Sequence, residues 1–248
     1  MKEPVRGAYD KSTYRSAPTA RNVIAWAIGP GIMKKADVLQ RIRDNGLIPV
    51  VRAESAELAL RAVEAIRAGG VSVLEVTMTV PGAIKVIEQL TNAFGDEAVI
   101  GAGTVLDLKT AQACLNAGAQ FIVSPSLDER TIDFCREHEV AVFPGALTPT
   151  EVVRAWNAGA DAVKVFPAGA VGGASYLKAL KAPLPQIELV PTGGVSLKTA
   201  ADFIKAGAMA LGVGADLIDL KAVREGREEL ITERARQFLE IVRHARHS

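Results

Sequence analysis

From residue 34 onward one unit repeats along the chain: a short run of β-branched and apolar residues, a turn, and a helical pattern that ends near glycine. Such alternation predicts a parallel sheet whose strands are joined by helices. We expect strands at residues 47–51, 71–77, 98–102, 120–124, 140–143, 161–166, 187–190 and 208–213. Eight such units in about 210 residues predict an α/β fold of the (β/α)8 (TIM) barrel type. An open doubly wound sheet is the alternative, but the first strand leads into Arg-Ala-Glu-Ser and not into a glycine-rich loop.

The predicted barrel, a catalytic domain, covers residues 34–248 and includes an extra N-terminal helix at 34–44, before the first strand. Residues 1–33 are polar and then interrupted by glycine and proline, so we expect an irregular N-terminal extension. The chain of 248 residues has a net charge of +1, which gives no electrostatic reason to expect a nucleic-acid or membrane partner. No apolar run reaches the roughly 18 residues of a membrane helix.

The cysteines and histidines argue against a metal or disulfide framework. Cys114 and Cys135 lie in predicted helices and form no C-x-x-C pair, which favours buried free thiols and a cytoplasmic location. The three histidines, His138, His244 and His247, all lie away from the strand ends. We therefore expect neither a metal cofactor nor a histidine general base.

Two predicted strands carry a charged residue, which is costly in a strand buried on both faces. Alternation places Glu75 of the second strand on the face opposite Leu74 and Val76, and therefore inside the barrel. The same argument points Lys164 of the sixth strand inward, together with Phe166. A carboxylate and an amine are thus expected to share one confined interior.

This pair suits one kind of chemistry. A lysine removed from water loses part of its preference for the charged form, and the free amine can attack a ketone to form a Schiff base. The protonated imine accepts electrons from a breaking carbon–carbon bond, and a nearby carboxylate such as Glu75 can move the protons. A buried ion pair that merely fills the barrel is the structural alternative, although apolar replacements of such pairs are often neutral or stabilising.

Glycine-rich segments follow the last two strands, where loops of this fold commonly bind phosphate through backbone N–H groups and a helix N-terminus. They are Pro191-Thr-Gly-Gly-Val195, with Thr192, Gly193 and Gly194, and Gly212-Val-Gly-Ala-Asp216, with Gly214 and Ala215. Each segment alone is also explained by a tight turn, whereas both together indicate a phosphate site.

Other candidates end the remaining strands. Arg52 offers a guanidinium that could grip a carboxylate or phosphate, or could be an ordinary surface arginine. Gly101-Ala-Gly-Thr104 is expected to open space in the barrel mouth, with the hydroxyl of Thr104 available to a ligand. Thr77, on the same face as Glu75, and Pro125, which follows the fourth strand, complete the predicted substrate pocket.

Taken in order, these motifs resemble the 2-keto-3-deoxy-6-phosphogluconate (KDPG) and 4-hydroxy-2-oxoglutarate (KHG) aldolases. The motifs are Leu74-Glu-Val-Thr77, Gly101-Ala-Gly-Thr-Val105, Val123-Ser-Pro125, Phe143-Pro-Gly145, Val163-Lys-Val-Phe-Pro167 and Pro191-Thr-Gly-Gly194, and the similarity covers roughly residues 34–246.

The resemblance implies a homotrimeric class I aldolase that needs no cofactor and cleaves KDPG to pyruvate and glyceraldehyde 3-phosphate in the Entner–Doudoroff pathway, with activity on 4-hydroxy-2-oxoglutarate. Lys164 would be the Schiff-base lysine and Glu75 the acid and base. Thr104 would hold the pyruvate carboxylate, with Arg52 nearby. Thr192 would contact the substrate chain, and Gly193 and Gly194 the phosphate.

The chain departs from the family pattern at two positions. Thr79 stands where some members carry arginine, so Arg52 would have to supply that anion contact. Ala215 stands where many members have serine, which leaves the phosphate to backbone N–H groups. Two other functions stay open: a non-catalytic barrel that binds a sugar phosphate, and a related keto-acid lyase or decarboxylase that uses the same lysine imine.

Overall fold

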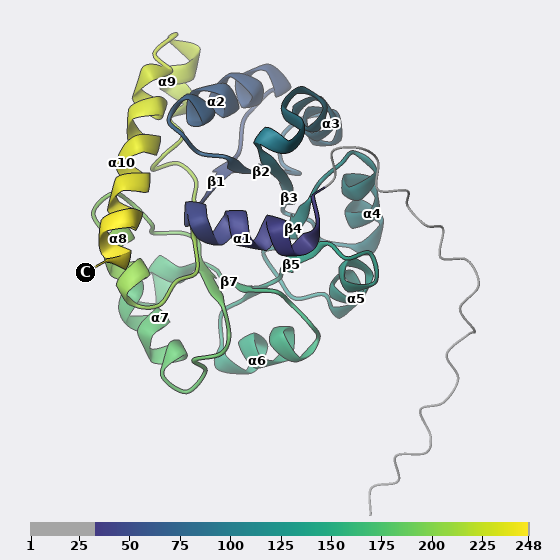
Figure 1. Ribbon diagram of the computed structural model, residues 1–248, viewed down its shortest axis with the longest axis vertical. Coiled ribbons are helices and arrows are strands. Elements are labelled where there is room, and N and C mark those ends of the chain that lie inside the picture. The colour runs from purple at the N-terminus through teal and green to yellow at the C-terminus, as the bar shows by residue number, and fades with distance from the viewer. Residues whose placement is uncertain (1–32, 248) are drawn as a thin grey trace, which may run out of the picture. The chain divides into compact units, whose positions relative to one another are not determined.

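The structure is a computed structural model, and it describes residues 33–247 (Figure 1). The extension expected at residues 1–33 therefore lies, apart from its last residue, outside the described part of the chain. None of the helices within 33–247 is long and apolar enough to cross a membrane.

Parallel strands form the centre of the fold. They are β1 (Leu47–Val51), β2 (Val73–Thr77), β3 (Val99–Gly103), β4 (Phe121–Val123), β5 (Ala141–Phe143), β6 (Gly145–Ala146), β7 (Val163–Val165), β8 (Leu189–Pro191) and β9 (Leu211–Val213). One six-stranded sheet has the order β5-β4-β3-β2-β1-β9, and a three-stranded sheet has the order β6-β7-β8. Each predicted strand has a counterpart, and β6 is an additional short segment just after Pro144.

The two sheets are connected on both sides. Isolated parallel bridges pair Leu189 with Ala208 and Thr192 with Gly212, which brings the edge of β8 to β9. On the other side β5 and β6 are separated only by Pro144, whose carbonyl accepts a hydrogen bond from the Lys164 backbone N–H at 2.9 Å. The result is a curled parallel sheet.

Helices surround the strands (Figure 1). They are α1 (Lys35–Asn45), α2 (Ala56–Ala68), α3 (Ala83–Phe94), α4 (Leu108–Asn116), α5 (Glu129–Glu137), α6 (Pro149–Asn157), α7 (Ala174–Lys181), α8 (Ala200–Lys205), α9 (Leu220–Arg224) and α10 (Glu229–Arg246), with 3-10 turns η2 (Gly95–Glu97) and η3 (Ala168–Val171). Pro81, a residue type favoured in the first turn of a helix, does not open α3. It lies in a turn, and the helix begins after Gly82, whose φ of 70° lies outside the helical range.

Alternation along the strands divides the core in two. Inward-facing side chains such as Val73, Phe121 and Phe143 form an inner cluster, and Val38 and Ile42 of α1 pack into it. Their neighbours in sequence, such as Leu74, face the surrounding helices in a larger outer cluster. In Figure 1, α1 lies across the ring of strands while the other helices surround it.

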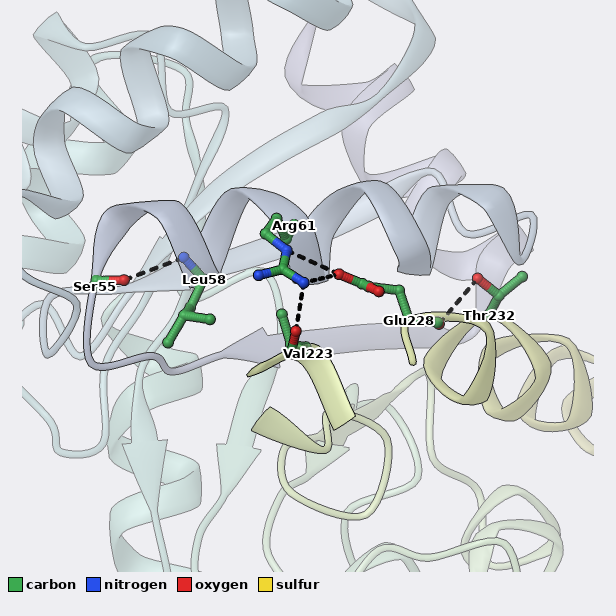
Figure 2. Close-up of polar contacts among 6 residues, drawn as sticks. All are labelled: Ser55, Leu58, Arg61, Val223, Glu228 and Thr232. Atoms are coloured by element: carbon green, nitrogen blue, oxygen red, sulfur yellow. Dashed lines mark hydrogen bonds and ion pairs between the residues drawn. The ribbon is translucent and has the colours of Figure 1, made fainter. Parts of the chain in front are cut away.

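Polar contacts fix the segment that follows β9 against α2 (Figure 2). Arg61 donates through Nε to Glu228 Oε1 at 2.8 Å and through Nη2 to the carbonyl of Val223. Thr232 donates from its hydroxyl to the carbonyl of Ala65 at 2.8 Å. These bonds hold α9 and the start of α10 to the helix after β1.

Both cysteines are buried free thiols. Burial raises the pKa of Cys114 and that of Cys135 to about 12, so both remain protonated at neutral pH.

Candidate active site

Glu75 and Lys164 lie together inside the curled sheet, as the alternation of β2 and β7 predicts. Their residues are 2% and 3% exposed, and Lys164 Nζ is 3.8 Å from Glu75 Oε1. Glu75 is the middle residue of β2 and Lys164 the middle residue of β7, so the loops at the carboxyl ends of the strands lie just beyond both. Phe166 follows, with its ring centroid 5.6 Å from Lys164 Nζ.

The carboxyl group of Glu75 rests against a glycine. A Cβ on Gly103 would lie 1.9 Å from Glu75 Oε1, so this position of β3 requires a residue without a side chain. The space beside Gly101 is also occupied, because a Cβ there would lie 2.3 Å from the Phe121 ring. The expectation that these small residues leave open space is therefore wrong: their space holds the Glu75 carboxyl group and the Phe121 ring.

Burial dominates the electrostatics of Glu75. It raises the pKa of this carboxyl group, while the positive charges of Lys164 and, to a smaller extent, Arg52 lower it. Oε1 is buried and has no hydrogen-bond partner among residues 33–247. A carboxyl group that keeps its proton above the ordinary range, beside an amine, is suited to exchange protons with a bound molecule.

Arg52 directly follows β1 and lies exposed, without a hydrogen bond or ion pair to any described residue. Its charge nevertheless lowers the pKa of Glu75, although less than burial raises it. Thr104 directly follows β3 with a φ of 57°, an uncommon value for a residue with a side chain. Both residues therefore lie at the carboxyl ends of their strands, just beyond the middle positions that Glu75 and Lys164 occupy in β2 and β7.

Thr77 has a second role that the sequence did not predict. Its hydroxyl donates to the carbonyl of Val51 at 3.0 Å and lies 2.6 Å from the hydroxyl of Thr79. Because the Thr77 proton is used on Val51, Thr79 must be the donor between the two hydroxyls. Thr77 thus joins the ends of β1 and β2 just before Arg52.

The loop after β8 crosses the segment after β7 at close range. Gly193 and Gly194 have φ values of 85° and 76°, which favour glycine. The Gly193 carbonyl accepts a 2.9 Å hydrogen bond from Gly169 N, and a Cβ on Gly194 would lie 2.7 Å from Gly169 Cα. Sequence reasoning missed Gly169, although it lies in the glycine-containing stretch that follows Val163-Lys-Val-Phe-Pro167.

Thr192 and Thr199 fix this loop from two sides. Thr192 is 5% exposed, and a Cβ on Gly212 would lie 2.1 Å from its hydroxyl oxygen, so the side chain crosses β9 where the strand has no side chain. The Thr199 hydroxyl donates to the Gly194 carbonyl and accepts from Ser196 N, both at 2.9 Å. Thr199 was also absent from the predicted site, because an isolated threonine gives no sequence signal.

Gly214 and Ala215 continue from β9 into a turn. The Gly214 carbonyl accepts from Leu217 N at 3.0 Å and from Ile218 N at 2.9 Å, and α9 begins only at Leu220. The expected helix N-terminus does not follow either glycine segment directly, since α8 begins at Ala200. The available donors at this corner are therefore loop N–H groups, and Ala215 is exposed beside them.

Pro125 borders the opposite side of the site. It is half-buried, and a Cβ on Gly145 would lie 2.2 Å from its carbonyl carbon. No group of three or more His, Cys, Asp or Glu side chains between residues 33 and 247 is arranged to hold a metal ion. The chemical groups that the site brings together are an amine, a carboxyl group, a guanidinium and loop N–H donors.

Comparison with known proteins agrees with this arrangement. The family model for KDPG and KHG aldolases matches residues 38–233. The chain belongs to this aldolase family. The 2-dehydro-3-deoxy-phosphogluconate aldolase of Treponema pallidum (strain Nichols) is 34% identical to it over 206 residues, which are 83% of this chain and 96% of that protein.

Two further relatives of this aldolase bear on its chemistry. The 2-dehydro-3-deoxy-6-phosphogalactonate aldolase of Escherichia coli (strain K12) is 38% identical over 172 residues, covering 69% of this chain and 83% of that protein. A solved KDPG aldolase from Legionella pneumophila holds pyruvate captured at low pH as a covalent carbinolamine intermediate. It is 33% identical, covers 80% of this chain and 96% of that one, and superposes with a TM-score of 0.74.

Proposed function

We propose that this chain is a class I aldolase that cleaves KDPG to pyruvate and glyceraldehyde 3-phosphate through a Schiff base on Lys164. The observation that carries the proposal is the buried pair of Lys164 Nζ and Glu75 Oε1, 3.8 Å apart inside the curled sheet. Apolar side chains would fill this interior at no greater cost in stability, so the pair is best explained by chemistry.

The reaction can be written on these two groups. The Lys164 amine attacks the C2 carbonyl of the substrate, and loss of water from the carbinolamine gives the protonated imine. The C4 hydroxyl loses its proton, the C3–C4 bond breaks, and its electron pair moves into the imine to form an enamine as the aldehyde leaves. Protonation of C3 and hydrolysis then release pyruvate. Glu75, with its raised pKa, moves protons at these steps, directly or through water.

The surrounding residues would orient the substrate. We assign the pyruvate carboxylate to Thr104 and Arg52, because both lie beside the reacting pair and Arg52 is free to form a bidentate contact. Thr77, Pro125 and Phe166 would line the pocket. Thr192 would contact the substrate chain, and N–H groups around Gly193, Gly194, Gly214 and Ala215 would bind the phosphate.

The chain is related to aldolases named for the gluconate and for the galactonate substrate. We favour KDPG because the motifs of the chain, among them Pro-Thr-Gly-Gly after β8, resemble those of the KDPG aldolases. Activity on unphosphorylated 4-hydroxy-2-oxoglutarate is also proposed, since Ala215 provides no hydroxyl for the phosphate.

We further propose that β5 and β6 act as one strand, so that the curled sheet closes into an eight-stranded (β/α)8 barrel with α1 as an extra helix at its amino end. This catalytic domain would span residues 34–248 and assemble as a homotrimer, as the family resemblance implies. The two protonated thiols fit a cytoplasmic enzyme, and the site residues fit a metal-free reaction of the Entner–Doudoroff pathway.

A coupled assay tests the proposal. Lactate dehydrogenase and NADH report pyruvate released from KDPG, its galactonate epimer and 4-hydroxy-2-oxoglutarate. We expect the highest kcat/KM with KDPG and no activity in Lys164→Met. Absence of pyruvate from all three compounds would favour a non-catalytic sugar-phosphate-binding barrel, and pyruvate from oxaloacetate alone would favour a decarboxylase.

A further inference from the structure

We propose that a second ligand site, for a phosphorylated small molecule that also carries a hydroxyl or amino group, lies at the end of the fold opposite Lys164. A cavity of about 590 Å³ lies there between the last turns of α1, the turn before β2 and the last turns of α10. Its lining includes Arg41, Asn45, Ser72, Arg236, Arg243 and Arg246. Volumes of about 300–1,000 Å³ are typical of small-molecule sites.

The position of the cavity separates it from the aldolase site. Asn45 precedes β1 and Ser72 precedes β2, so the cavity opens at the amino ends of these strands. The glycine loops of the aldolase site follow the carboxyl ends of β8 and β9, and Lys164 lies in the middle of β7. A molecule in this cavity would therefore contact α1 and α10 (Figure 1) without displacing substrate.

The lining carries an excess of positive charge. Four arginines face two acidic residues, Asp44 and Glu240, and His247 adds a titratable group. The complete chain has a net charge of only +1, so this concentration is local. Guanidinium groups bind phosphate through two parallel N–H contacts, which makes an anionic ligand the natural partner.

Capping of helix ends explains only some of these arginines. Arg246 donates to the carbonyls of Asp44 at 3.1 Å and Met209 at 3.0 Å, and its role is to dock α10. Arg236 makes a 3.4 Å contact to the Ala68 carbonyl at the end of α2. Arg41 donates one hydrogen bond, from Nη1 to the Asp96 carbonyl at 2.6 Å. Arg243 has no hydrogen bond or ion pair to any residue in 33–247, so all its donors are available.

Asn45 adds a requirement to the ligand. Its Nδ2 donates to the Ser72 hydroxyl at 3.0 Å, but its Oδ1 is buried and receives no hydrogen bond from the described residues. A buried carbonyl oxygen is costly to leave unpaired. A ligand with a hydroxyl or amino donor beside its phosphate, such as a sugar phosphate or a nucleotide, would satisfy both Asn45 and the arginines.

The chain's own N-terminal segment does not match this cavity in charge. Residues 1–32 contain five lysines and arginines against two acidic residues, so the segment repeats the positive charge of the lining. A separate anionic ligand therefore complements the charge of the cavity, whereas residues 1–32 do not.

Calorimetric titration of the full-length protein with ADP, in buffer of low ionic strength, tests the site. We expect Arg243→Gln to weaken ADP binding about tenfold or more, as for loss of a charge-assisted phosphate contact. Arg234→Gln is the matched control, because it removes the same charge from α10 at a residue 3.6 Å from Asp219 and outside the cavity. It should leave the affinity nearly unchanged.

Two further titrations, one with a variant and one with a different ligand, show where the molecule binds and which of its groups are recognised. Ala215→Asp places a negative charge beside the proposed catalytic phosphate loop and should not weaken ADP if the ligand sits at the opposite end. Pyrophosphate, which lacks the ribose hydroxyls and the adenine amino group of ADP, should bind more weakly than ADP. The proposal is overturned if ADP gives no binding, if Arg243→Gln has no effect, if pyrophosphate binds as tightly as ADP, or if only Ala215→Asp weakens the complex.

Discussion

At the scale of single residues, the properties of Glu75 follow from what surrounds it. The interior of the curled sheet removes its carboxyl group from water, and Gly103 supplies the space in which the group lies. Lys164 is close enough to offset part of the cost of its charge. Strand alternation predicted that both residues point inward, because an apolar face opposite each one is visible in the sequence. The role of Gly103 was not predictable, since the contact joins residues of different strands.

Replacing Glu75 with glutamine should slow turnover of KDPG by about 10²- to 10⁴-fold, because a positioned proton donor and acceptor is lost. Formation of the pyruvate imine should be affected much less, since the Lys164 amine remains. Steady-state kinetics and borohydride trapping as a function of pyruvate concentration measure the two effects separately. Near-full turnover in Glu75→Gln would mean that another group or a water molecule moves the protons.

The raised pKa of Glu75 also predicts a pH dependence of stability. The folded protein holds its proton above the ordinary value of 4.5, whereas the unfolded chain releases it there. The folded state therefore loses stability as pH rises from that value through the raised pKa. Urea unfolding at several pH values should show this effect. Over this pH range, the free energy of unfolding of the wild type should fall relative to that of Glu75→Gln. A difference that is constant with pH would show that burial does not shift this group.

At the scale of elements, the sequence predicted the order of the strands and the helices between them, because each helical pattern ends near glycine. The sequence analysis did not use the capping box of α6, in which Thr148 accepts from Glu151 N and the Glu151 side chain accepts from Thr148 N. The contact between the β8 loop and Gly169 was missed because it joins two loops in space. Pro81 lies outside α3 although proline is favoured in a first turn, because proline also suits a turn that precedes a helix.

Ala215→Ser tests the proposed phosphate corner with little risk to the fold, since Ala215 is exposed. An added hydroxyl can donate to the phosphate, so KM for KDPG should fall by about two- to tenfold. KM for unphosphorylated 4-hydroxy-2-oxoglutarate should not change, which makes that substrate the internal control. Equal effects on both substrates would place the phosphate elsewhere.

At the scale of the whole molecule, alternation of strands and helices predicted a parallel sheet wrapped by helices, and the structure has this form. The sequence did not indicate β6, which follows β5 after Pro144, because this short segment is defined by its pairing with β7, whereas β5 pairs with β4. The cavity between α1 and α10 was likewise absent from the sequence analysis. Its lining comes from both ends of the described chain, and no local pattern connects them.

The proposed mechanism uses only side chains of this chain, so chelators should leave the enzyme active. Dialysis against EDTA, followed by the pyruvate-release assay, should give an unchanged kcat/KM. Activity that is lost on dialysis and restored by zinc or magnesium would move the reaction to metal-dependent aldol chemistry.

Reductive trapping tests the central claim most directly. Incubation with pyruvate and sodium borohydride should reduce the imine to a stable secondary amine, and peptide mass spectrometry should locate the adduct on Lys164, with loss of activity in proportion to labelling. Lys35 provides a comparison within the same digest, because its amine is held 2.9 Å from Asp161 and should stay unmodified. Labelling of another lysine, or full activity after reduction without any adduct, would contradict the assignment of Lys164.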